Sequence, residues 1–197
     1  KNNNSAIYIS LFSSLATLIL SLFVWYSMDY ASADFQFLEE QSWINDFIKF
    51  KLGIDGISIL FIVLTTLITP ICIISCINSV KDRVKEFLIA ILILETFMIG
   101  VFCSLDLVVF YLFFEAGLIP MFLIIGVWGG TRRVYSAFKF VLFTLLGSVL
   151  MLVAIITIYW ITGTTDVTQI YEIKIPKEYQ NLLWLAFFSS FAVKMPM

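Results

Sequence analysis

The sequence contains no histidine and few charged residues. Of its 197 residues, 13% are Asp, Glu, Lys or Arg, whereas a soluble domain carries roughly a quarter. Hydrophobic residues make up 61% of the chain, against roughly half in a soluble domain. The net charge of −2 gives no argument for nucleic acid as a partner, and no basic cluster is interleaved with aromatic residues. The composition therefore predicts a chain that is solvated by lipid.

Cysteine is also scarce. The three cysteines, Cys72, Cys76 and Cys103, lie within apolar runs and form no CxxC pair. Because the chain has no His either, we expect no metal site, and we interpret the cysteines as packing residues.

Long apolar runs dominate what remains. A helix needs about 20 mostly apolar residues to cross a membrane. Six runs are candidates, near 6–28, 54–78, 87–105, 107–128, 135–161 and 182–197. The turn at Ser104-Leu105-Asp106 divides the third run from the fourth. We therefore expect an all-α integral membrane protein whose residues 1–197 form one transmembrane helical domain.

The two ends of the sequence are unusual for a complete membrane protein. The sixth run is 16 residues long, and the sequence stops while it is still apolar. A backbone end inside lipid would leave carbonyl groups without hydrogen-bond partners. The chain also begins KNNN, without an initiator Met. We expect the chain to be a fragment of a longer polypeptide.

Charge in the loops predicts the orientation. The connections on one side are the N-terminus, 79–86 and 129–139. They carry seven cations and two acids, whereas the opposite side carries four lysines and ten acids. The cations are Lys1, Lys81, Arg83, Lys85, Arg132, Arg133 and Lys139. The positive-inside rule places this basic side in the cytoplasm or the mitochondrial matrix. The opposite side includes the long connections 29–53, expected to cover the interface, and 162–181.

Three charges lie inside the apolar runs. Glu95, Glu115 and Lys194 are each expected roughly 12–18 Å from a membrane face, close to the midplane. A charge at that depth costs about 2.5–3.5 kcal/mol. Two acids and one base at similar depth indicate a shared polar interior. Its role is either conduction of protons or a structural ion pair that fixes helix packing; the remaining alternative is that the charges extend to the membrane surface.

Two prolines accompany these ions. Pro120 has no N–H to donate to the carbonyl of Ala116, and Pro196 likewise frees the carbonyl of Ala192. Interrupted helices with free carbonyls beside a buried ion are typical of transport sites at the membrane midplane. Lys139, near the start of the fifth run, either extends its ammonium to the basic side or leads a hydrated path inward from it.

Lys194 provides proton chemistry. Burial disfavours the charged form of an amine, and a nearby carboxylate favours it. Protonation or movement of Glu115 would then switch Lys194 between holding a proton and releasing it. Sodium fits this site less well, because a Lys ammonium would repel it.

Four segments together resemble a known family. They are KLGIDGISILFIVLTTLITPI (51–71), YLFFEAGLIPMFLIIGVWGG (111–130), SAFKFVLFTLLGSVLML (136–152) and FAVKMPM (191–197). In order and spacing they are similar to the antiporter-like membrane subunit of respiratory complex I, subunit 4 or chain M. Related Na⁺/H⁺ antiporter subunits share parts of the same pattern.

The resemblance implies roles for individual residues. The family's essential membrane glutamate matches Glu115, and its essential lysine on a proline-broken helix matches Lys194. The lysine of the KF motif matches Lys139, and a less strictly required glutamate matches Glu95. The family fold has fourteen helices, of which this chain would match the second to the early seventh, with the last broken at Pro196.

The resemblance also implies a function. It points to the proton-translocating membrane arm of an NADH:ubiquinone reductase, with no redox centre in this chain. NAD, FMN, iron–sulfur clusters and ubiquinone would be held by partner subunits, among them paralogous antiporter-like subunits. The location would be the mitochondrial inner membrane or a bacterial plasma membrane. The alternatives are a subunit of a multi-subunit Na⁺/H⁺ antiporter and a purely structural membrane scaffold.

Overall fold

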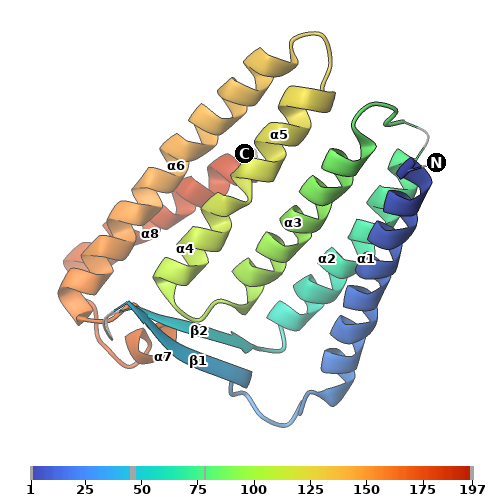
Figure 1. Ribbon diagram of the computed structural model, residues 1–197. Coiled ribbons are helices and arrows are strands. Elements are labelled where there is room, and N and C mark those ends of the chain that lie inside the picture. The colour runs from blue at the N-terminus through green and yellow to red at the C-terminus, as the bar shows by residue number, and fades with distance from the viewer. Residues whose placement is uncertain (1, 45–47, 78, 196–197) are drawn as a thin grey trace.

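The computed structural model describes residues 2–44, 48–77 and 79–195, and it is a bundle of long helices that stand side by side (Figure 1). The helices are α1 (Asn2–Ser27), α2 (Ser58–Cys76), α3 (Val84–Cys103), α4 (Leu107–Ala116), α5 (Leu118–Trp128), α6 (Arg133–Thr162), α7 (Val167–Ile170) and α8 (Lys177–Lys194). Helices α1, α2 and α3 pack together in one half, and α4, α5, α6 and α8 form the other.

The helical segments are long and apolar enough to cross a membrane. Five stretches meet that criterion: Asn4–Ser27, Ser58–Cys76, Val84–Cys103, Leu107–Trp128 and Arg133–Thr162. The expected all-α membrane class is therefore confirmed. The sixth expected run lies in α8, which begins with the polar sequence KEYQN and so falls outside these five.

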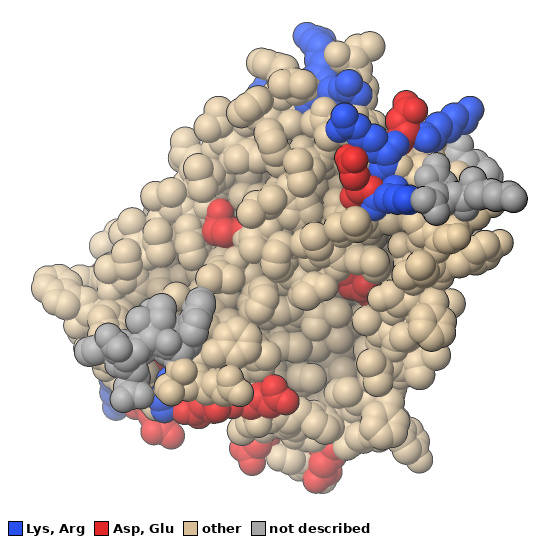
Figure 2. Space-filling model, viewed as in Figure 1, with Lys and Arg blue, Asp and Glu red and all other residues tan. Residues whose placement is uncertain are grey.

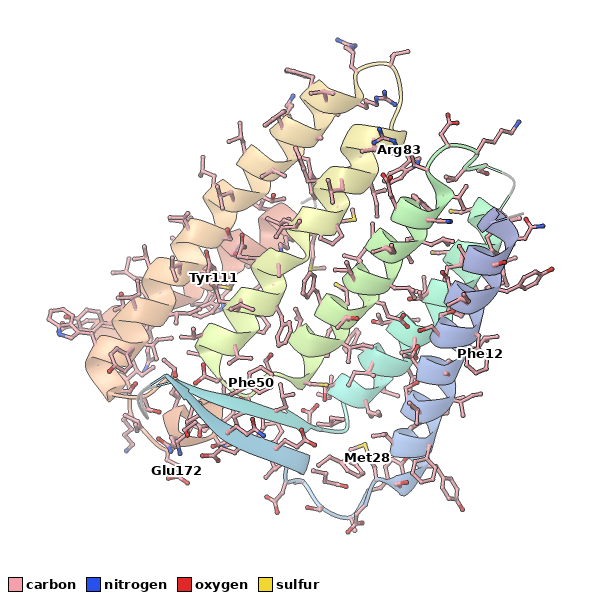
Figure 3. The ribbon with its side chains drawn as sticks, in the orientation of Figure 1. Phe12, Met28, Phe50, Arg83, Tyr111 and Glu172 are labelled. Carbon is pink, nitrogen blue, oxygen red and sulfur yellow. The ribbon has the colours of Figure 1, made fainter. Side chains whose placement is uncertain are left out.

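The outside of the bundle is apolar. Phe12 points outward from α1 with 77% of its surface exposed (Figure 3), and Leu146 and Trp160 on α6 are 72% and 86% exposed. Small and hydroxyl side chains instead occupy the contacts between helices, as Ser14 and Ala137 do, both of which are fully buried. This inverted arrangement is the one that lipid favours, because small residues allow helix backbones to approach closely.

A β-hairpin departs from the all-α expectation. Strand β1 (Gln36–Ile44) pairs antiparallel with β2 (Ile48–Ile54) across one end of the bundle (Figure 1). Lys49 and Glu40 form an ion pair of 2.6 Å across the hairpin. The search for long apolar runs missed these strands because they are short and carry polar residues.

Charged residues separate to the two ends of the bundle. Figure 2 shows Lys and Arg gathered at the end with the α2–α3 and α5–α6 loops, and acids along the end with the hairpin. The N-terminus lies at the basic end (Figure 1). This is the relative arrangement expected from the loop charges.

The fourth run consists of two helices rather than one. Helix α4 ends at Ala116, Gly117 joins the two, and α5 begins at Leu118. Pro120 is buried in the first turn of α5 and cannot donate to the carbonyl of Ala116. Free carbonyl groups are therefore available beside Glu115.

Candidate functional site

The ammonium of Lys194 lies at the end of α4. Its Nζ donates to the carbonyl oxygen of Phe114 at 2.6 Å, and it stands 3.1 Å from the centroid of the Phe114 ring. Lys194 is the last residue of α8, and it is partly buried. A single residue of α4 thus provides both a hydrogen bond and an aromatic face to the cation.

The position of this ammonium has a physical cause. Carbonyl groups in the last turn of a helix lack a partner within the helix, and Phe114 lies in the last turn of α4. The C-terminal end of a helix also carries partial negative charge that favours a cation. Because α4 and α8 both end at this point, Lys194 lies at two helix C-termini.

Glu115 is adjacent to this contact but does not form a direct ion pair with Lys194. Ion pairs within 4.0 Å in the described residues are Lys49–Glu40, Lys51–Asp166 and Arg83–Glu86. The charges of Glu115 and Lys194 still interact electrostatically. The Oε1 atom of Glu115 is buried and has no hydrogen-bond partner among the described residues. The site therefore holds an amine bound to the carbonyl of Phe114 and an acid on the next residue of α4.

Aromatic side chains enclose the contact between α4 and α8. The rings of Phe114 and Phe191 meet edge to face at 5.9 Å, and Phe110 stacks on Phe114 at 5.6 Å. Phe187 extends this group along α8, at 6.4 Å from Phe191. The aromatic rings exclude water from one side of the ammonium, which strengthens its interactions with nearby charge.

Helix α6 closes the site from another side. Gly147 of α6 packs so tightly on Val193 of α8 that a Cβ at residue 147 would lie 3.0 Å from the valine side chain. Tyr111, one turn before Glu115, lies between α4 and α6 (Figure 3), close to the buried Ser148 of α6. Close packing of α6 thus fixes both helices that carry the charged pair.

Glu95 occupies a different polar layer. It is 5% exposed on α3 and accepts a 3.0 Å hydrogen bond from Thr17 of α1, with a further interaction from Thr69 of α2. Ser21 and Thr66 hydrogen-bond each other at 2.8 Å in the same three-helix contact. Glu95 is therefore satisfied by hydroxyl groups of α1 and α2, apart from the contact between Lys194 and Phe114.

Two further predicted site residues have less defined surroundings. Lys139 is exposed on α6, and within the described part of the chain it makes no ion pair with any carboxylate. Pro196, the expected break after Lys194, lies outside the described residues.

The structure also reveals a junction at the acidic end that sequence reasoning missed. Asp106 caps α4 by accepting from the N–H groups of Val108 and Val109, and it accepts from the hydroxyl of Thr165. Lys51 of β2 donates to Asp166 at 2.7 Å. The available signal was an Asp placed directly before an apolar helix, which is typical of an N-cap.

Asp166 lies outside the five stretches that are long and apolar enough to cross a membrane. Burial opposes its ionisation, but hydrogen bonds from Lys51 and Thr168 outweigh burial and lower the pKa of the Asp166 carboxyl below its ordinary value. The Lys51 side chain is only 11% exposed. The ion pair is thus a buried one.

Family models match nearly the whole chain. The model for the amino terminus of NADH-ubiquinone oxidoreductase chain 4 matches residues 2–101. A second, for the transmembrane part of NADH:quinone oxidoreductases and Mrp antiporters, matches residues 104–197.

Individual relatives and solved structures give the same result. The chain is 50% identical to NADH-quinone oxidoreductase subunit M of Rhodobacter capsulatus, over 99% of this chain and 40% of that protein. It is also 50% identical to NADH-ubiquinone oxidoreductase chain 4 of Marchantia polymorpha, over 96% of this chain and 39% of that protein. Respiratory complex I from Thermus thermophilus with bound NADH superposes with a TM-score of 0.86 at 26% identity, covering 96% of this chain and 40% of the matched chain. A chain of the Mrp complex from Dietzia shares the fold, with a TM-score of 0.78 at 14% identity. The match covers 98% of this chain and 24% of the matched chain.

These matches agree with the family that the four sequence segments indicated. The chain spans about 40% of the length of the curated relatives it matches. Both halves of the sequence match family models, and the bundle has the fold of a chain in a solved respiratory complex I. The chain belongs to the family of NADH-ubiquinone oxidoreductase chain 4, which includes subunit M of the bacterial NADH-quinone oxidoreductases.

Proposed function

We propose that this chain contributes part of a proton pathway in the membrane arm of a respiratory NADH:quinone oxidoreductase. The observation that carries the proposal is the contact between Lys194 and the carbonyl of Phe114. It places an amine beside Glu115, whose Oε1 atom is buried without a partner. Intramembrane ionisable groups are expensive, and they commonly mark ion pathways.

The geometry supports a switch between two states of Lys194. When Glu115 is ionised, its charge and the two helix C-termini stabilise the ammonium. When Glu115 takes up a proton, one source of that stabilisation is lost and the desolvated amine more readily releases its own proton. Glu95 and Lys139 are proposed as supporting members of the path, and Pro120 and Pro196 as the breaks that free backbone carbonyls.

The surroundings of the pathway follow from the family. We place NAD, FMN, iron–sulfur clusters and ubiquinone in partner subunits, and expect other membrane-arm subunits, including paralogous antiporter-like ones, to contact this chain. The basic end would face the mitochondrial matrix or the bacterial cytoplasm. The presence of plant and bacterial relatives is consistent with either membrane.

Replacement of Glu115 by Gln in the assembled complex tests the proposal. Glutamine keeps the size of the side chain but cannot ionise, so we expect proton pumping at matched NADH oxidation to fall by about tenfold or more. Glu86→Gln is the matched control, because Glu86 is an exposed acid in the basic loop region. Undiminished pumping in the Glu115 variant would reject the proposal.

The antiporter alternative rests on the shared fold and on the family model over residues 104–197, which covers both NADH:quinone oxidoreductases and Mrp antiporters. The Mrp complex is similar at 14% identity, whereas subunit M of Rhodobacter capsulatus is similar at 50%. Purification of the intact assembly separates the two functions. Subunits that oxidise NADH are expected to co-purify with the chain, and a preparation without them that exchanges Na⁺ for protons would favour the antiporter.

A further inference from the structure

Helix α4, which carries Glu115, starts at a junction with the connection that leads to α8, the helix that carries Lys194. Helix α4 begins directly after Asp106, whose Oδ1 accepts from the N–H groups of Val108 at 2.8 Å and Val109 at 3.2 Å. The other carboxylate oxygen of Asp106 accepts from the hydroxyl of Thr165. Thr165 belongs to the connection that leads from α6 towards α8. One carboxylate thus joins the base of α4 to that connection.

Backbone hydrogen bonds reinforce this link. The N–H of Leu107 donates to the carbonyl of Thr165 at 2.9 Å, and the N–H of Val167 donates to the carbonyl of Leu105 at the same distance. Asp106 and Thr165 are 1% and 4% exposed. Buried hydrogen bonds to a charged group are stronger than those between neutral groups. The junction is therefore a rigid, water-excluded connection.

Strand β2 of the hairpin also forms hydrogen bonds with the junction. Lys51 of β2 donates to Asp166 at 2.7 Å and to Thr168 at 2.8 Å, and its carbonyl accepts from the N–H of Leu105 at 3.0 Å. Asp166 also caps α7 by accepting from the N–H of Thr168 at 2.9 Å. A single lysine thus fixes the turn before α4 and the cap of α7 at once.

An apolar cluster continues the connection into the bundle. Leu183 of α8 packs with Ala154 and Ile158 of α6, and Leu107 at the start of α4 and Ile170 of α7 pack against them. The bases of α4, α6, α7 and α8 therefore share one small core. Glu115 lies nine residues beyond Asp106, which is about 13 Å along a helix. A shift or tilt at the base will move Glu115 relative to Lys194.

We propose that Asp106 and Thr165 are positioning residues, which set the relative height and tilt of α4 and α8 and so hold Glu115 beside Lys194. This inference rests on the proposed function of that pair. Neither residue touches the ammonium. They act through the helix that begins at Asp106 and the connection that contains Thr165.

Thr165→Val tests the inference with the smallest change. Valine has the shape of threonine and keeps the backbone bonds of residue 165, but it cannot donate to Asp106. Thr165→Ser restores the donor and is the conservative variant. Thr157→Val is the control, because the Thr157 hydroxyl bonds only the carbonyl of Val153 on its own helix and is exposed.

Two readouts in the assembled complex separate positioning from simple loss of stability. The first is the number of protons pumped per electron, which an unstable but correctly arranged complex does not change. We expect Thr165→Val to lower the number of protons pumped per electron by about 2- to 30-fold, the range for changes along a packed coupling network. Thr165→Ser and the control Thr157→Val should keep the parent number of protons pumped per electron.

The second readout is a cryo-EM structure of the Thr165→Val complex. We expect the Lys194 Nζ to leave hydrogen-bond distance of the Phe114 carbonyl oxygen. If the variant does not assemble, Thr168→Val removes a single hydroxyl from the same junction and carries the same expectation with a smaller effect.

The outcomes distinguish this inference from the proposed function. If Glu115→Gln lowers the proton-to-electron ratio and Thr165→Val leaves it unchanged, the positioning role is overturned alone. If Glu115→Gln leaves the ratio unchanged, the proposed function fails, and the cryo-EM contact then decides the positioning role by itself. An unchanged contact between Lys194 and Phe114 in the valine variant would overturn the inference in either case.

Discussion

Lys194 and Phe114 are joined by a hydrogen bond of 2.6 Å between the last residue of α8 and the last turn of α4. The contact brings together two helix ends that carry the same partial charge, and the ammonium neutralises both. Glu115 follows Phe114 in the chain, so the carboxylate and the amine are linked through one residue of backbone. Within the described residues, the two side chains lie on neighbouring groups without a direct ion pair.

Replacing Lys194 by Arg tests whether the amine must lose its proton. Arginine keeps the positive charge but does not deprotonate in proteins. We expect Lys194→Arg to lower proton pumping by about tenfold or more, with assembly of the complex retained. Proton uptake by membrane vesicles during NADH oxidation measures the effect. An arginine variant that pumps like the parent would show that the residue serves only as a structural cation.

Any side chain at Gly147 is expected to weaken the packing of α6 on α8. Alanine at this position would place its Cβ 3.0 Å from Val193, the neighbour of Lys194. We expect Gly147→Ala to destabilise the chain by about 1–3 kcal/mol and Gly147→Leu to prevent native packing of α8. Thermal unfolding in detergent checks the first expectation.

Gly126→Ala provides the matched control for Gly147. A Cβ at residue 126 would lie 3.6 Å from Ala137, an ordinary van der Waals contact. Equal stability of the two alanine variants would contradict the close approach of α6 and α8.

The polar layer around Glu95 yields a separate expectation. Thr17→Val removes the 3.0 Å hydrogen bond to Glu95 and leaves a buried oxygen less satisfied. A lost partner of a buried polar group costs about 1–3 kcal/mol. We expect Thr17→Val to lower the unfolding free energy by this amount when Glu95 is present, and by much less in a chain that already carries Glu95→Ala. A double-mutant cycle of unfolding free energies measures the difference. Additive effects would show that the two side chains do not interact.

The ion pair at the acidic end gives a pH dependence. Because the pKa of Asp166 in the folded protein is lower than in the unfolded chain, its stabilisation is complete above about pH 4 and is lost as the pH falls through the folded value. Lys51→Met breaks the buried pair, at an expected cost of about 3 kcal/mol near neutral pH. The difference in melting temperature between parent and variant should shrink in acid. A difference that stays constant from pH 7 to pH 3 would refute the assignment.

The sequence predicted the membrane class and the charged residues for physical reasons. Apolar length determines whether a helix spans lipid, so the runs up to Thr162 were recognisable from composition. Glu115 and Lys194 were recognisable because charges inside such runs are costly. No local rule predicts that Lys194 meets a carbonyl of α4, since that contact depends on where two helices cross.

Other features depend on contacts between distant parts of the chain. Lys51 and Asp166 are 115 residues apart, and neither is unusual in a polar loop until the fold brings them together. The hairpin was missed because its strands are stabilised by each other rather than by an apolar run. Glu95 was expected to share a polar interior with Glu115 and Lys194, whereas the partners found for it are hydroxyl groups on α1 and α2, which spacing does not identify.

Glu115 and Lys194 are proposed to act as one unit in proton translocation. A double-mutant cycle of Glu115→Gln and Lys194→Met in the assembled complex measures this directly, with protons pumped per electron as the readout. Groups that act together are strongly non-additive, so the double variant should pump about as poorly as the worse single variant. If the two losses multiply in the double variant, or if either single variant keeps the parent number of protons per electron, Glu115 and Lys194 do not act as one unit.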